Sequence, residues 1–149
     1  MSTASDPLQI ACPACHALNR VPAARLHDGP VCGRCKAPLF AGHPVALDEA
    51  GFARHVEQGT LPVLVDFWAP WCAPCRMMAP HFEAAAARLE PAFRLAKVDT
   101  EAVPALGARF GIRSIPTLAL FHRGREVARH SGAMGSADIE RWVRSQRLG

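Results

Sequence analysis

The sequence has no apolar run that approaches the roughly 20 residues of a membrane-spanning helix. Its first eleven residues, MSTASDPLQIA, contain neither the basic start nor the apolar stretch of a secretory signal. Charge of either sign is nearly balanced, since 17 Lys and Arg against 13 Asp and Glu give a net charge of +4. We therefore expect a soluble protein of the reducing cytoplasm without membrane contact, where persistent structural disulfides are rare.

Features of nucleic-acid-binding and nucleotide-binding proteins are also missing. The basic residues are scattered, except for Arg141, Arg144 and Arg147 near the C-terminus. Their regular spacing indicates a solvated helix face rather than a nucleic-acid surface. The sequence also lacks a glycine-rich dinucleotide loop. It therefore predicts no nucleic-acid partner and no bound organic cofactor.

Against this background the six cysteines stand out, because each is separated from a partner by two residues. The pairs are Cys12/Cys15, Cys32/Cys35 and Cys72/Cys75. Three disulfides would suit a small secreted scaffold, but 149 residues are enough for a hydrophobic core and no export signal is visible. A pair with this spacing can also be half of a metal site or a reactive dithiol.

The first two pairs have the spacing of a zinc site with four thiolate ligands. They lie in residues 12–38, a segment poor in large apolar side chains that cannot build a core alone and therefore needs a metal. Four cysteine ligands leave no open coordination position, which indicates one structural zinc ion. The alternatives are two reducible disulfides or unligated thiols. The expected ligands are Cys12, Cys15, Cys32 and Cys35.

Three histidines, His16, His27 and His43, lie close enough in sequence to replace a ligand. With four cysteines available, we expect each of them to be an ordinary surface histidine. The segment has few aromatic side chains that could stack on bases. We therefore expect the zinc module to stabilise the fold or to provide a docking surface.

From about residue 45 onward, the pattern alternates between apolar strands and helical segments, which predicts an α/β domain with a mixed sheet. Asp48 and Ser136 are candidate N-caps of the first and last helices. We divide the chain into a tail (1–11), a zinc-ribbon module (12–38), a linker (39–44) and the α/β domain (45–149). The expected elements are helices over 47–59, 73–90, 103–111 and 136–148, strands over 62–68 and 93–99, and a hairpin over 117–132.

The third pair differs from the other two, because it follows a buried strand and opens a helix. Unpaired N–H groups and the dipole at a helix N-terminus favour an anion, so Cys72 would be held partly as the nucleophilic thiolate. Pro74 suits the first turn, where its missing N–H costs nothing. Cys75 lies one turn further and could resolve the mixed disulfide that Cys72 forms. No other cysteine pair remains to complete a second metal site.

The segments VDFWAPWCAPC, AKVD, FGIRSIPTLALF, HRGRE and SGA resemble the thioredoxin family in order and spacing. The resemblance covers residues 43–149, and with the four-cysteine extension it points to the zinc-containing bacterial thioredoxins. It implies the thioredoxin fold, a central mixed sheet flanked by helices, in a protein that is usually monomeric. Ala73 departs from the usual glycine, which leaves the redox potential open.

By this resemblance Asp66 is the buried acid behind the dithiol. An acid in VLVDFW would be desolvated and its pKa raised, so it could accept the proton of Cys75, through a water. The alternative is an acid paired with Lys97, which matches a family lysine near this position. Pro116 matches the family's cis-proline, which leaves the backbone of Ile115 available to an extended substrate segment.

The resemblance also implies an apolar rim that receives the partner protein. Trp68 is expected to pack near the site and Trp142 in the core. The expected substrate-binding residues are Trp71, Ala73, Pro74, Ile115, Gly132 and Ala133.

The function implied is that of a protein-disulfide reductase. Its partners would be disulfide-containing client proteins and a flavin-dependent thioredoxin reductase that uses NADPH. An oxidase or isomerase on the same fold is a second interpretation, although export would be expected for it. A third is a zinc-ribbon binding module or redox-sensing chaperone, in which thiol chemistry serves as a switch.

Overall fold

The computed structural model describes residues 7–148, and its centre is a five-stranded sheet in the order β3-β5-β4-β6-β7. β3, β5 and β4 are parallel, whereas β6 pairs antiparallel with both β4 and β7. This confirms the expected α/β class and mixed sheet. The strands are β3 (Val45–Ala46), β4 (Val63–Trp68), β5 (Arg94–Asp99), β6 (Thr117–His122) and β7 (Arg125–Ser131).

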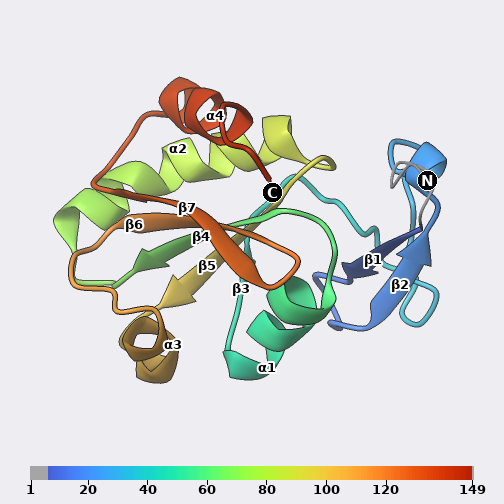
Figure 1. Cartoon of the computed structure of the whole chain (residues 1–149), viewed down its shortest axis with the longest axis horizontal. Coiled ribbons are helices and arrows are strands. Elements are labelled where there is room, and N and C mark those ends of the chain that lie inside the picture. Colours follow the sequence, from blue (N-terminus) through green and yellow to red (C-terminus); the bar gives the residue numbers. More distant parts are fainter. Residues whose placement is uncertain (1–6, 149) are drawn as a thin grey trace.

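Helices cover both faces of the sheet (Figure 1), with α2 and α4 on one face and α1 and α3 on the other. The helices are α1 (Glu49–Phe52), continued by the π-helical turn η3 (Ala53–Gln58), α2 (Ala73–Leu89), α3 (Pro104–Arg109) and α4 (Ser136–Arg144). Since side chains alternate along a strand, β4 contributes Val63, Val65 and Phe67 to one core and Leu64 to the other. Asp66 therefore lies on the α2 face, together with Leu64.

The two candidate N-caps have different outcomes. Asp48 caps α1, because its Oδ1 accepts a hydrogen bond of 2.7 Å from the backbone N–H of Gly51. The assignment of Ser136 as an N-cap is wrong, since the N-cap of α4 is Gly135 and no side chain caps this helix. Gly135 has the extended backbone that precedes a helix, so Ser136 is already its first helical residue.

The N-terminal module is a small two-stranded unit beside the main sheet (Figure 1). β1 (Leu8–Ala11) and β2 (Leu18–Val21) pair antiparallel, and a short 3-10 helix, η2 (Ala23–Arg25), follows. The segment expected to be a tail therefore contains β1. Its residue Ile10 is 1% exposed and belongs to the module's own core, which no pattern within residues 1–11 indicated.

The module packs tightly against the main domain, and Arg94 of β5 holds the two together. Its guanidinium is 2% exposed and donates to Glu90 Oε2, to the carbonyl of Ala11 and to the carbonyl of Leu39, each at 2.9 Å. Gln9 adds a pair of 2.9 Å hydrogen bonds with Thr60. The position of the module is therefore set by buried polar contacts as well as by apolar packing.

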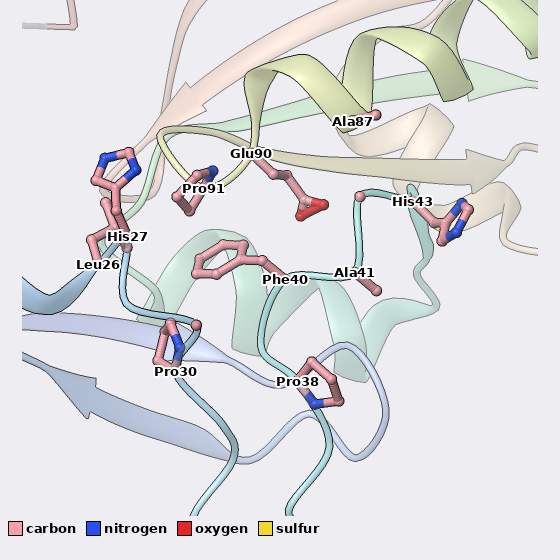
Figure 2. A pocket seen from close by; sticks show the side chains of 12 residues that line it. Leu26, His27, Pro30, Pro38, Phe40, Ala41, His43, Ala87, Glu90 and Pro91 are labelled. Atoms are coloured by element: carbon pink, nitrogen blue, oxygen red, sulfur yellow. The ribbon is translucent and has the colours of Figure 1, made fainter.

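The segment 39–44, expected to be a linker, belongs to the contact between the N-terminal module and the main domain, which we call the seam. Leu39 is fully buried in the module's core. Phe40 and Ala41 line a hollow of about 580 Å³ together with Glu90 and Pro91, at the end of α2. Figure 2 shows these residues facing one another. The segment is therefore packed along its first residues. Within residues 7–148, none of the helices combines the length and the apolar character needed to cross a bilayer.

Candidate active site and metal centre

The third cysteine pair lies at the beginning of α2, immediately after β4. Cys72 is the N-cap residue, and its Sγ accepts a hydrogen bond of 3.2 Å from the backbone N–H of Cys75. The two sulfurs form a disulfide with Cα atoms 5.2 Å apart, so the structure describes the oxidised form. Cys72 is 4% exposed and Cys75 1%, which makes Cys72 the more accessible of the two.

The helix that begins here supplies an electrostatic asymmetry. α2 has 17 residues, and the backbone N–H of Cys75 in its first turn, which has no partner in the helix, donates to the sulfur of Cys72. A helix N-terminus favours negative charge. After reduction, the charge is therefore better accommodated at Cys72, the position from which a nucleophile can reach a partner.

Asp66 is fully buried on β4, on the same side of the sheet as α2. Neither carboxylate oxygen has a hydrogen-bond partner among the residues that the structure describes. Burial raises the pKa of Asp66 from 3.8 to about 7, and the charge of Lys97 opposes this shift. Lys97 is its register partner on β5, but its ammonium lies 4.5 Å from the ring centre of Trp68 instead of bonding the carboxylate.

The loop before β6 approaches the disulfide from the other side. The peptide bond between Ile115 and Pro116 is cis. Ile115 packs against the cluster of Ala69, Cys72 and Cys75, and its carbonyl oxygen lies 3.7 Å from the Sγ of Cys72. The carbonyl of Pro116 accepts a 2.9 Å hydrogen bond from the backbone N–H of Gly132. The structure therefore brings together three segments that are far apart in sequence.

A groove of about 640 Å³ lies beside Cys72, between the start of α2, α3 and the loop that contains Ile115. Trp71 is 64% exposed at its edge, and its indole N–H donates to Glu101 at 2.9 Å. Ala73 and Pro74, both exposed, also line the groove. Gly132 and Ala133 are not among its lining residues, although the backbone N–H of Gly132 donates to the carbonyl of Pro116.

The first two cysteine pairs converge, as their spacing predicted. The four sulfurs all lie within 4.8 Å of one another, with Cys12 and Cys35 at 3.6 Å and Cys15 and Cys32 at 3.7 Å. Four sulfurs placed tetrahedrally at 2.3 Å from one zinc ion would lie about 3.8 Å apart. The donor set and its spacing therefore fit zinc.

Backbone amides around this cluster favour thiolates. The N–H of Cys35 and the side-chain amide of Asn19 donate to the Sγ of Cys32 at 3.5 Å, and together they lower its pKa to about 6. The N–H of Arg34 adds a further bond. The two turns are built alike, since residues 16 and 36 both have a left-handed backbone and donate to the carbonyl of the first cysteine.

The histidines near this module have separate positions. His27 is exposed, and His43 is exposed beside Glu83. His16, expected to be an ordinary surface histidine, instead lies 3.0 Å from His55, with Nδ1 facing Nε2 across the seam. Burial lowers the pKa of His55 to about 3, so its imidazole is neutral near pH 7. The local sequence carried no signal for this contact.

Comparison with known proteins agrees with this arrangement. Residues 43–145 match the family described as Thioredoxin, and residues 11–37 match the family described as Thioredoxin 2, N-terminal. The chain belongs to the thioredoxin family. It is 47% identical to Thioredoxin C-3 of Corynebacterium nephridii over 137 residues, 92% of this chain and 94% of the relative.

Other relatives extend the comparison to thioredoxins from algae. The thioredoxin of Porphyra purpurea is 45% identical over 92 residues, covering 62% of this chain and 86% of its own. The M-type chloroplast thioredoxin of Chlamydomonas reinhardtii is 34% identical over 126 residues, 83% of this chain and 90% of its own. The expected fold, resemblance and enzyme class are confirmed: the chain is a thiol–disulfide oxidoreductase of this family with an N-terminal zinc-ribbon module.

Sequence reasoning missed the buried ion pair of Glu90 and Arg94. Their spacing of four residues was visible, but the chain between them leaves a helix and enters a strand. Burial opposes the charge of both groups, raising the pKa of Glu90 and lowering that of Arg94. Arg94 also contacts the carbonyls of Ala11 and Leu39, far away in the sequence, so the importance of this pair could not be derived from local patterns.

Proposed function

We propose that this thioredoxin-family chain reduces disulfides of client proteins through Cys72 and Cys75. The thiolate of Cys72 attacks one sulfur of the client disulfide, which forms a mixed disulfide and releases one client thiolate. Cys75 then loses its proton and attacks the sulfur of Cys72, which releases the second client thiolate and restores the intramolecular disulfide. The client gains two electrons and the dithiol loses two.

The observation that carries this proposal is the position of Cys72 at the N-terminus of α2, three residues before Cys75. The sulfur accepts the N–H of Cys75, and it is the more exposed of the pair. One sulfur is thus suited to attack and the other to resolve.

In this mechanism Asp66 accepts the proton of Cys75 during resolution. Its pKa of about 7 lets the carboxylate and the acid interconvert near neutral pH, which is the requirement for a general base. The acid lies on the α2 face of the sheet, and its oxygens have no partner among the described residues. Lys97 moderates this pKa through its charge. Pro116, joined to Ile115 by a cis peptide bond, orients the backbone of Ile115.

Clients bind at the groove beside Cys72, and the exposed ring of Trp71 supplies apolar contact area. Ile115 offers backbone groups to an extended client segment. Ala73 and Pro74 form the near wall, and Gly132, which donates to the carbonyl of Pro116, would extend the client contact with Ala133 beyond the groove lining. The residue at position 73 adjusts the redox potential.

The family works in general with a thioredoxin reductase and with disulfide-containing proteins. For this chain we propose re-reduction by an NADPH-dependent reductase, in the cytoplasm, with the chain acting as a monomer. The cluster of four cysteines supports this compartment, because metal-binding thiolates need reducing conditions.

We also propose that residues 12–38, with β1, form a structural module that binds one zinc ion, while 39–44 connects it to the catalytic domain at 45–149. Bound zinc would hold the four thiolates together and supply folding free energy. The ligands would be Cys12, Cys15, Cys32 and Cys35, with each pair held by its own turn.

Two substitutions test the main proposal. Cys72→Ser protein should not reduce insulin, whereas Cys75→Ser protein should remain linked to its clients as mixed disulfides that survive non-reducing electrophoresis. Full insulin turnover by Cys72→Ser protein would contradict the mechanism. Equilibration with glutathione buffers separates reductase from oxidase, because an oxidant would remain reduced even in oxidising mixtures.

A further inference from the structure

The loop at residues 110–116, between α3 and β6, forms one wall of the groove beside Cys72 and presents Ile115 to the site. Much of the loop is exposed, including Gly111, Arg113 and Ser114. Apolar packing alone therefore does not hold it in place. Phe110 and Ile112 pack against the core, and polar contacts at the two ends of the loop add to this packing.

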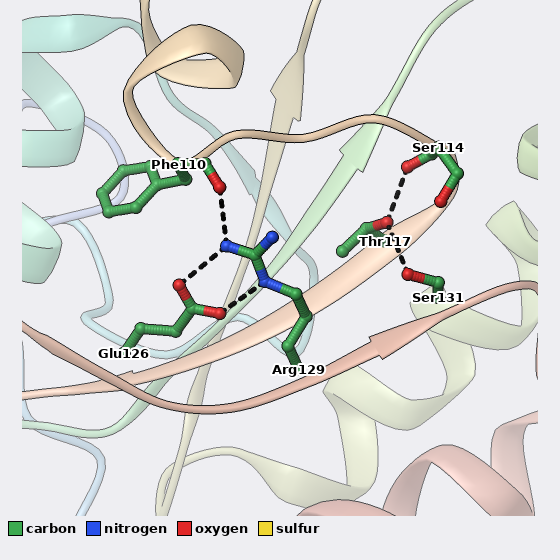
Figure 3. Close-up of polar contacts among 6 residues, drawn as sticks. All are labelled: Phe110, Ser114, Thr117, Glu126, Arg129 and Ser131. Atoms are coloured by element: carbon green, nitrogen blue, oxygen red, sulfur yellow. Dashed lines mark hydrogen bonds and ion pairs between the residues drawn. The ribbon is translucent and has the colours of Figure 1, made fainter.

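Arg129 of β7 holds the beginning of this loop (Figure 3). Its Nη2 donates to the carbonyl of Phe110 at 2.7 Å, across 19 residues of sequence. The same guanidinium forms two bonds with Glu126, from Nε at 2.6 Å and from Nη2 at 2.8 Å. A bidentate contact with a carboxylate fixes the plane of the guanidinium. The N–H that donates to Phe110 is therefore oriented before any client binds.

An irregularity in β7 makes this geometry available. In a regular strand, residues three apart point to opposite faces. The register changes between Leu120 and Phe121, which pair with Ala128 and Glu126, so Val127 is an extra residue. A bulge of this kind brings Glu126 and Arg129 to the same side of the strand.

Thr117 holds the other end of the loop (Figure 3). Its hydroxyl lies 2.6 Å from the carbonyl of Ser114 and 3.3 Å from the hydroxyl of Ser131. A hydroxyl has one proton, and a carbonyl can only accept, so Thr117 donates to Ser114 and accepts from Ser131. Thr117 is 2% exposed, which protects this contact from water.

We propose that Arg129 is a positioning residue for client binding: held by Glu126, it fixes the carbonyl of Phe110 and thereby orders the groove wall that presents Ile115. This inference rests on the proposed disulfide reductase function. Arg129 has no contact with Cys72, Cys75 or Asp66 among its hydrogen bonds. Its removal should therefore weaken client binding and leave the chemistry of the dithiol unchanged.

The test compares Arg129→Met with Arg125→Met, a matched control on the same strand whose exposed side chain makes none of these contacts. Insulin serves as the protein client, and 5,5′-dithiobis(2-nitrobenzoate) serves as a small disulfide that needs no groove wall. We expect Arg129→Met to raise the KM for insulin about three- to tenfold, the loss typical of a charged hydrogen bond to a loop. The kcat of this variant for insulin and its rate with the small disulfide should stay within twofold of the wild type. Its redox potential should not shift.

A lysine at the same position separates positioning from packing. Arg129→Lys keeps the positive charge and a similar side-chain length but loses the bidentate geometry of the guanidinium. Its KM for insulin should therefore lie between those of the wild type and Arg129→Met. Faster amide hydrogen exchange at residues 112–115 in Arg129→Met would support a loosened wall. An unchanged KM, or an equal loss with insulin and the small disulfide, would overturn the inference. Failure of the wild-type protein itself to reduce either substrate would instead refute the proposed function.

Discussion

The replacement Asp66→Asn tests the electrostatics of the site most directly. The carboxyl group is fully buried without a hydrogen-bond partner among the described residues, and its pKa in the folded protein is about 7 rather than 3.8. Between about pH 4 and pH 7 the folded protein keeps a proton that the unfolded chain has released. The free energy of unfolding therefore decreases as the pH rises through this window.

The size of this effect follows from the pKa difference. Each tenfold change in proton affinity is worth about 1.4 kcal/mol, so the complete penalty is about 4 kcal/mol above pH 7 and vanishes below about pH 4. Asparagine has a similar shape and no charge at any pH. Asp66→Asn should consequently match the wild type at pH 4 and be more stable by about 2–4 kcal/mol at pH 8.

Urea unfolding of the oxidised protein at pH 4, 6 and 8 measures this difference. Asp138→Asn, at an exposed acid that pairs with Arg141, is the control and should change stability by less than about 1 kcal/mol at every pH. A stability gain for Asp66→Asn that does not depend on pH would refute the reasoning, as would no gain at pH 8. The same variant should accumulate mixed disulfide during turnover, because Cys75 would lack its proton acceptor.

Two further predictions concern the N-terminal module. Purified protein should contain one zinc ion per chain by metal analysis, and Cys32→Ser should lose it; metal-free protein after anaerobic preparation would exclude the site. Arg94→Met removes the donors to Glu90, Ala11 and Leu39 and leaves a buried carboxylate unpaired, so it should lower the free energy of unfolding by about 3–5 kcal/mol. Arg88→Met, at a side chain 74% exposed, should cost less than about 1 kcal/mol, and equal effects of the two would contradict a buried anchor.

Local features of the chain predicted much of the fold. The apolar run from Val63 to Trp68 became a strand covered on both faces, and Asp48 capped its helix. Ser136 did not cap, because the backbone turn before α4 is made one residue earlier, at Gly135. β1 was missed because its partner strand, β2, lies outside residues 1–11. The residues that bury β1 also lie outside that segment.

The sequence by itself determined the chemistry of this protein. Two residues between paired cysteines permit either convergence on one metal ion or a disulfide across one helical turn, and both depend only on short-range geometry. A strand followed by a cysteine at a helix start likewise indicates, from neighbouring residues alone, the sulfur that we propose as the nucleophile.

Only the tertiary structure decided how that chemistry is tuned. The pKa of Asp66 depends on burial beneath α2, and the place of Arg94 depends on carbonyls 83 and 55 residues away. The contact of Arg129 with Phe110 needs both the hairpin and its extra residue. Desolvation and long-range hydrogen bonds are properties of the assembled chain, because they arise between segments that meet only when it folds.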